Sequence, residues 1–205
     1  MAISTIVRLT TIALVFIFMP GCSSISTVAS VANIAMEASG LKAPKVPELP
    51  DAQKPARTVS VKLHAAKILN TDDEGKSLAL VMRIFKLRQT AAFQQASYDS
   101  FLNPEKEKEA FGGDIVEVKE VTLVPGRKFE IEEKVSREAY FIGVVALFRK
   151  PAQKHWRIAF AADEAEKSGI IIGAHACALT VGIGKITADS SFSNSLLSPE
   201  LCTQQ

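Results

Sequence analysis

The chain from Thr58 onward alternates apolar and polar side chains with the period of a β-strand. Residues 59–65 have the sequence Val-Ser-Val-Lys-Leu-His-Ala, which is typical of a strand that buries one face. Residues 78–87 and 140–148 are apolar on both faces, and this pattern predicts central strands of a sandwich. Further strands are predicted at residues 114–123, 128–135, 155–160 and 174–181.

Helical and turn signals interrupt these strands. Residues 90–98 predict a short helix with Thr90 as its N-cap, and Pro104 begins another short, charged helical turn. Residues 124–127, Val-Pro-Gly-Arg, suit a type II turn between two strands. Roughly seven or eight short strands with one small helical insertion predict an all-β, antiparallel β-sandwich. We place this domain at residues 58–185.

Residues 1–21 are similar to a bacterial lipoprotein signal peptide. Their apolar run is shorter than the ~20 residues needed to cross a bilayer, and its length and flanks fit a cleaved secretory segment. A small residue, Gly21, stands directly before the first cysteine, Cys22, as in a lipobox. This similarity implies cleavage after Gly21 and lipidation of Cys22. By analogy with lipoprotein sorting, Ser23 at the next position suggests the periplasmic face of the outer membrane. The alternative is a plain signal peptide followed by an incidental cysteine.

Residues 22–57 are predicted to carry the lipid, a short helix and a tether. Apolar residues recur at helical spacing over 26–39. The segment 41–57 has proline at every third position from Pro44 to Pro50, followed by Pro55, and each proline fixes φ and removes a hydrogen-bond donor. Such a segment is extended and reaches about 50 Å at ~3.1 Å per residue. Residues 186–205 form a polar C-terminal tail.

The charge balance and the scarcity of motifs exclude several functions. Lys and Arg number 24 against 22 Asp and Glu, which argues against a nucleic-acid-binding surface. His175 and Cys177 share one strand face and could supply two metal ligands, but no second pair completes a site, so core packing is favoured. The segment 182–185 lacks the spacing of a phosphate loop. The sequence therefore predicts no metal, no catalytic residue, no small-molecule substrate and no cofactor other than the covalent lipid.

Two cysteines remain once Cys22 is lipidated. Cys177 and Cys202 form an even pair in an oxidising compartment, so a disulfide between them is expected. Such a bond would attach the polar tail to the last strand. The alternative is two unpaired thiols, with Cys177 buried as a small apolar residue.

An ordered set of segments from Val59 to Phe160 resembles a known family, the TssJ outer-membrane lipoproteins of the type VI secretion system. The segments are Leu63-His-Ala-Ala, Leu69-Asn, Leu80-Val-Met-Arg-Ile-Phe-Lys-Leu, Ala92-Phe-Gln-Gln-Ala, Glu120-Val-Thr-Leu-Val-Pro-Gly, Tyr140-Phe-Ile-Gly-Val-Val-Ala-Leu-Phe-Arg and Trp156-Arg. The resemblance implies a transthyretin-like β-sandwich with a helical insertion. It also implies a non-catalytic component of the membrane core complex, which binds the periplasmic C-terminal region of the inner-membrane protein TssM. Through TssM the protein would join the TssL-containing core complex.

The resemblance also points to a contact site, because in this family the loop between the first two strands contacts TssM. Here that loop is residues 67–76. The partner-binding residues carried over to this sequence are Asn70, Thr71, Asp72, Asp73, Glu74 and Gly75. Their acidic side chains create a local negative charge, which is expected to pair with Lys or Arg on the partner.

Three alternatives stay open at this point. The loop could be an ordinary solvated connection, since most loops only connect strands. The protein could be a pilotin-like assembly lipoprotein of another envelope machine. It could also be a periplasmic enzyme on a transthyretin-like scaffold, but that function needs a convergent polar pocket.

Overall fold

The computed structural model describes residues 50–187 and Cys202 of the 205-residue chain. The signal peptide, Cys22, the helix expected at 26–39, most of the tether and most of the C-terminal tail lie outside the described residues, so they stay predictions. The described residues belong to one compact unit. Within them, no helix is long and apolar enough to cross a membrane.

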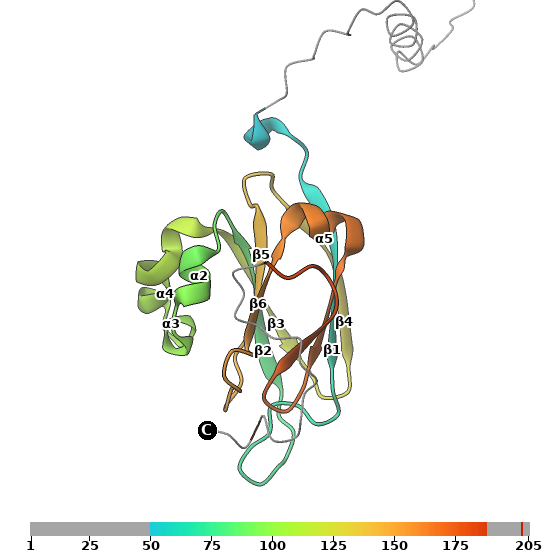
Figure 1. The fold of residues 1–205 in the computed structure, drawn as a ribbon. Helices are drawn as coiled ribbons and strands as arrows, with labels where there is room; N and C mark the ends of the chain where they lie inside the picture. The colour runs from blue at the N-terminus through green and yellow to red at the C-terminus, as the bar shows by residue number, and fades with distance from the viewer. Residues whose placement is uncertain (1–49, 188–201, 203–205) are drawn as a thin grey trace, which may run out of the picture. The chain divides into compact units, whose positions relative to one another are not determined.

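Eight strands form two four-stranded sheets that pack face to face (Figure 1). The first sheet has the order β4-β1-β7-β8. Its strands are β1 (Arg57–Ala65), β4 (Lys128–Val135), β7 (Ile170–Ala174) and β8 (Leu179–Ile183). The second sheet has the order β3-β2-β5-β6, and its strands are β2 (Leu80–Leu87), β3 (Ile115–Leu123), β5 (Phe141–Ala146) and β6 (Arg157–Ala161). The predicted β-sandwich is therefore confirmed, and the two runs predicted as central strands are β2 and β5.

One strand pair departs from the antiparallel pattern. β1 and β7 run parallel, with Val61 opposite Ile170 and Ala65 opposite Ala174, while every other pair of named strands is antiparallel. Helix α5 (Ala162–Ser168) follows β6 and carries the chain from the second sheet to β7 in the first. Parallel neighbours require such a crossover connection, because a tight hairpin reverses the chain.

The single last strand predicted at residues 174–181 is wrong. The structure has a hairpin there, with β7 ending at Ala174 and β8 beginning at Leu179. The backbone N–H of His175 donates to the carbonyl oxygen of Ala178 at 3.0 Å and closes the turn. Residues 175–178 contain neither Pro-Gly nor Asn-Gly, so no turn was predicted there. Helix α5 was also not predicted.

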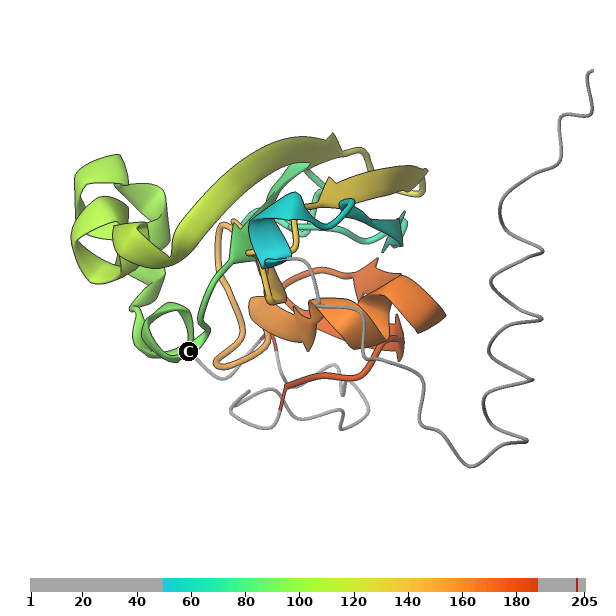
Figure 2. The ribbon, with the colours of Figure 1, turned by 90° about the horizontal axis from the view of Figure 1, so that it is seen from above.

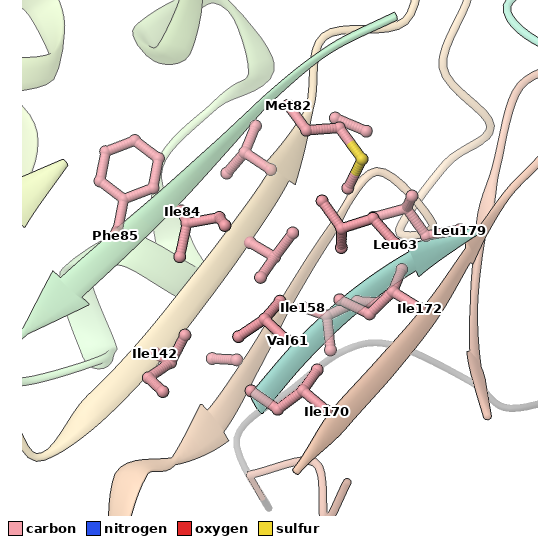
Figure 3. Close-up of a cluster of buried hydrophobic side chains, with 14 of the residues drawn as sticks. Val61, Leu63, Met82, Ile84, Phe85, Ile142, Ile158, Ile170, Ile172 and Leu179 are labelled. Atoms are coloured by element: carbon pink, nitrogen blue, oxygen red, sulfur yellow. The ribbon is translucent and has the colours of Figure 1, made fainter. Parts of the chain in front are cut away.

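The core lies between the two sheets. Inward-facing aliphatic side chains of β1 and β7 meet those of β2, β5 and β6 (Figure 3). Val61 and Leu63 are 0% exposed, as are Met82 and Ile172. This layer is the dominant stabilising feature, since each fully buried aliphatic side chain contributes about 1.5–3 kcal/mol before the cost of ordering it.

A helical insertion between β2 and β3 covers the outer face of the second sheet and lies at one side of the sandwich (Figure 2). It contains α2 (Ala91–Gln95), α3 (Tyr98–Leu102), α4 (Pro104–Phe111) and the 3-10 turn η2 (Gly112–Asp114), and a further 3-10 turn, η1 (Asp51–Gln53), precedes β1. The helix predicted at residues 90–98 is α2, which already ends at Gln95, and α3 is a further short helix that was not predicted. Thr90 occupies the N-cap position of α2, but its side chain makes no capping hydrogen bond.

Aromatic rings hold the insertion on the sheet. Phe85 of β2 contacts Phe93, Phe101 and Phe111 of the insertion, with ring centroids 5.6, 5.8 and 5.9 Å away. These tilted and edge-on contacts are the geometry that aromatic pairs prefer. Gly143 of β5 makes room for them, because a Cβ at this position would lie 2.6 Å from Cζ of Phe93.

Candidate functional site

The loop that the sequence singled out lies at one end of the sandwich, which we call the loop end (Figure 1). Four connections meet there: the β1–β2 loop (residues 66–79), the β3–β4 turn (124–127), the β5–β6 loop (147–156) and the β7–β8 turn (175–178). Hydrogen bonds join these connections to one another.

Asn70 supports the base of the β1–β2 loop from inside. Its side chain is 7% exposed. Nδ2 donates to the carbonyl oxygen of Ala79 at 2.8 Å, and Oδ1 accepts from the backbone N–H of Arg149 at 2.8 Å. Its backbone lies at a φ of 43°, a left-handed conformation that Asn tolerates better than most residues. The structure therefore places Asn70 beneath the surface that a partner could touch.

Thr71 joins the loop to the β7–β8 turn. Its backbone N–H donates to the carbonyl oxygen of Ala176 at 3.2 Å, and the N–H of Asn70 donates to the carbonyl oxygen of His175 at 3.2 Å. The N–H of Gly126 in the β3–β4 turn donates to the carbonyl oxygen of Ala66 at 3.0 Å. The β1–β2 loop is therefore fixed on three sides, by the β3–β4 turn, the β5–β6 loop and the β7–β8 turn.

Asp72 organises the tip of the loop. Its Oδ1 accepts from the backbone N–H groups of Glu74 at 3.1 Å and Lys76 at 2.8 Å. The N–H of Gly75 donates to the carbonyl oxygen of Asp72 at 3.1 Å, and Gly75 has a φ of 79°. Glycine suits this position because a side chain is strained at positive φ. Asp and Gly thus give the tip a defined turn, which agrees with the turn-forming character that the sequence indicated.

Asp73 is paired within the chain. Its carboxylate accepts from Nη2 of Arg149 at 2.5 Å and from Nζ of Lys150. The hydrogen bond from Lys150 and the charge of Arg149 hold the pKa of Asp73 below its ordinary value. The predicted negative charge is consequently balanced by two cations, which sequence analysis missed because they follow β5, more than seventy residues later. Glu74, the third acidic residue, is exposed.

Two large apolar side chains are exposed at the loop end. Ile68 of the β1–β2 loop is 64% exposed and Val124 of the β3–β4 turn is 53% exposed. Their loops are neighbours, since Gly126 and Ala66 share the hydrogen bond described above. Neither residue was singled out from the sequence, because a single exposed aliphatic residue in a loop carries no signal of its own.

The structure joins Cys177 and Cys202 by a disulfide at the loop end, with the two Cα atoms 5.7 Å apart. A hollow of about 320 Å³ lies between this disulfide and the β1–β2 loop. It is lined by Thr71, Asp72, Asp73, Gly75, Lys150, Ala176, Cys177 and Cys202.

The residues that could have suggested a metal site or a phosphate loop have other roles in the described part of the chain. Residues 50–187 and Cys202 contain no group of three or more His, Cys, Asp or Glu side chains that could hold a metal ion. His175 lies with Nε2 at 2.9 Å from Oγ1 of Thr180, and burial lowers its pKa. Cys177, the other suggested ligand, is in the disulfide. The glycines of residues 182–185 lead from β8 into a β-bridge between Ile186 and Phe160, not into a helix.

Comparison with protein families matches residues 57–177 to the T6SS-SciN family, whose description reads "Type VI secretion lipoprotein, VasD, EvfM, TssJ". The matched range begins with β1, contains the whole β1–β2 loop and ends at Cys177. Comparison with curated protein sequences finds no match.

Several solved structures are similar to this chain. The T6SS lipoprotein TssJ1 from Pseudomonas aeruginosa is 28% identical, with a TM-score of 0.57 over 64% of this chain and 98% of that one. A chain of a structure described as "Type VI membrane complex" is 29% identical, with a TM-score of 0.57 over 62% and 98% of the two chains. A chain of a structure described as the T6SS protein TssM C-terminal domain from EAEC is 30% identical, with a TM-score of 0.54 over 61% and 97%.

Proposed function

The chain belongs to the T6SS-SciN family of type VI secretion lipoproteins, and from this membership we propose that it anchors the secretion membrane complex to the outer membrane. In this proposal the lipid on Cys22 holds the periplasmic face of the outer membrane. The tether of residues 41–57 sets how far the sandwich can extend from the membrane. The sandwich binds the periplasmic C-terminal region of a TssM-like inner-membrane protein, and through it the TssL-containing core complex.

The observation that carries the proposal is the preorganised loop end. The β1–β2 loop is hydrogen-bonded to the β3–β4 turn, the β5–β6 loop and the β7–β8 turn. A loop that is already fixed in one conformation loses less entropy on binding, which leaves more of the contact energy for affinity. A rigid sandwich that presents a fixed polar loop is a common arrangement for recognition.

The surface composition supports a protein partner. The exposed tip residues Glu74 and Gly75 lie in the same loop as the exposed apolar residue Ile68, and the neighbouring turn contributes Val124. Protein interfaces combine apolar contacts with a polar rim in this way. We expect the partner to place a basic side chain opposite Glu74, which would fix orientation more than affinity.

The proposed mechanism is binding and geometry, with no bond made or broken. Family membership supports this, because the family is one of secretion lipoproteins. The lipid anchor would be firm, since each buried methylene contributes about 0.8 kcal/mol and several acyl chains act together.

Copurification from membranes tests the proposal. The tagged full chain is expressed in its host, solubilised with detergent and captured, and the retained proteins are identified by mass spectrometry. We expect a TssM-like protein with the full chain, and we expect a Cys22→Ser variant to leave the membrane fraction. Retention of components of a different envelope machine, with no TssM-like protein, would contradict the proposal and favour the assembly-lipoprotein alternative.

A further inference from the structure

Cys202 lies at the loop end, where the disulfide joins it to Cys177. The family match stops at residue 177, so β8 and everything after it lie beyond the matched range. The disulfide spans a sequence separation of 25 residues and brings Cys202 back beside the β7–β8 turn. A residue from outside the matched range is therefore fixed next to the loop that we propose as the partner contact.

The attachment point of this disulfide is itself firmly held. Cys177 is 3% exposed, and it packs with Ala152 and Ala178, against which Cys202 lies. The carbonyl oxygen of Cys177 accepts from the N–H of Ala152 at 2.8 Å, which joins the turn to the β5–β6 loop. The position of Cys202 is thus tied to the same network that fixes the β1–β2 loop.

The hollow at the loop end has walls from both parts of the chain. One wall is the β1–β2 loop from Thr71 to Gly75, and the other is Ala176 with the Cys177–Cys202 disulfide. Lys150 completes the lining. Any protein that covers the tip of the β1–β2 loop also lies at the mouth of this hollow, because Asp72, Asp73 and Gly75 belong to both surfaces.

We infer that the TssM-like partner docks across this hollow and inserts a side chain against the Cys177–Cys202 disulfide, so that Cys202 completes the docking surface. This inference rests on the proposed function. The walls fit a long amphipathic side chain, whose apolar stem packs on the disulfide and the Ala176 methyl group while its polar tip stays at Thr71 and Asp72. Burial of a compact apolar contact inside a polar rim is the arrangement of an interface hot spot.

The test fills the hollow while both cysteines stay in place. Binding of the full chain to the periplasmic C-terminal region of the TssM-like protein is measured by biolayer interferometry for wild type and Ala176→Trp. We expect at least about a tenfold loss of affinity, because the indole occupies the space that the partner side chain needs. Glu109→Trp is the matched control: it adds the same side chain at an exposed position of α4 and is expected to bind like wild type.

A second variant keeps the test decisive if Ala176→Trp does not fold. The double substitution Cys177→Ser/Cys202→Ser removes the disulfide wall of the hollow, and the folding of this variant is followed by circular dichroism. Weaker binding by this folded variant supports the inference. Wild-type affinity in either folded variant overturns the inference and leaves the proposed function intact. Failure of the wild-type chain itself to bind the TssM-like protein would instead overturn the proposed function.

Discussion

Asn70 accepts a hydrogen bond from the backbone N–H of Arg149 at 2.8 Å, which joins two loops that are 79 residues apart in the sequence. The same side chain donates to the carbonyl oxygen of Ala79 at 2.8 Å. One buried amide therefore connects both ends of the β1–β2 loop and the β5–β6 loop. This explains how a loop with acidic and glycine residues at its tip can hold a single conformation.

Asn70→Ala is expected to destabilise the sandwich. The substitution leaves two backbone groups without partners and places alanine at positive φ, so we expect a loss of about 2–3 kcal/mol in the free energy of unfolding. Urea denaturation followed by tryptophan fluorescence measures this. Thr122→Ala, at an exposed position of β3, serves as the control and should change the free energy by less than about 0.5 kcal/mol. Equal stability of the two variants would show that the Asn70 bonds contribute nothing.

Loss of the disulfide is expected to lower stability without changing the fold. For a sequence separation of 25 residues, the chain-entropy model gives about 3 kcal/mol. We therefore predict that Cys177→Ser/Cys202→Ser unfolds at a lower urea concentration than wild type, with the same circular dichroism spectrum. Cys22→Ser is the matched control, since it removes a cysteine outside the sandwich. A single unfolding midpoint shared by all three proteins would contradict the prediction.

Gly143→Ala is expected to disturb the contact between the second sheet and the helical insertion. The added Cβ would lie 2.6 Å from Cζ of Phe93 and 3.1 Å from Cδ1 of Leu87, and such overpacking costs about 1–3 kcal/mol. Gly113→Ala is the control, because a Cβ there meets nothing within 4 Å. We expect a lower midpoint of thermal unfolding for Gly143→Ala alone. If the two alanine variants melt together, the packing described for Phe93 is incorrect.

A buried ionic group between the two sheets predicts a pH dependence of stability. Glu133 of β4 lies 3.2 Å from Nζ of Lys86 and 2.9 Å from Nζ of Lys119. Burial alone would raise the pKa of the Glu133 carboxyl, but hydrogen bonds from Lys119 and Lys86 outweigh it, so the pKa lies below its ordinary value. A carboxyl with a lowered folded-state pKa stabilises the fold above its unfolded pKa, and this contribution is lost as the pH falls through the folded pKa.

Glu133→Gln tests this pH dependence. At pH 7 we expect the variant to be about 2 kcal/mol less stable than wild type, because Lys86 and Lys119 both lose the charge of Glu133, although Lys86 keeps Glu117 at 2.8 Å. The difference should shrink as the pH falls from about 5 to 3, since wild type then loses its own carboxylate. Urea denaturation at several pH values measures it. Glu132→Gln, an exposed neighbour on β4, is the control. A difference that stays constant with pH would contradict the assignment.

Much of the sandwich could be predicted from local patterns. The alternation in β1 and the apolar runs of β2 and β5 are properties of single segments, and these strands lie where the patterns placed them. Helix α5 was missed because it has only seven residues and lies between two apolar strands. The β7–β8 hairpin was missed because its turn, held by the bond between His175 and Ala178, contains no typical turn residues.

At the candidate site, the sequence could predict local turns but not contacts between distant residues. Local turn chemistry at Asp72 and Gly75 could be predicted, but the partners of Asn70 and Asp73 could not. Arg149 and Lys150 reach the loop only because β5 and β1 lie in facing sheets and end near each other. Contacts of this kind depend on the tertiary arrangement, which a strand pattern alone does not determine. For the same reason, the supporting role of Asn70 inside the loop end could not be predicted from the sequence.

The most direct test of the central claim is the affinity of the full chain for the periplasmic C-terminal region of the TssM-like protein. The test variant is Ile68→Ser/Glu74→Arg, which alters the exposed surface of the loop end. The matched control, Leu102→Ser/Glu109→Arg, makes the same changes at exposed positions of the helical insertion. We predict that wild type and control bind alike and that the loop-end variant binds at least about tenfold more weakly. Equal affinity of all three proteins would contradict the claim that the loop end docks the partner.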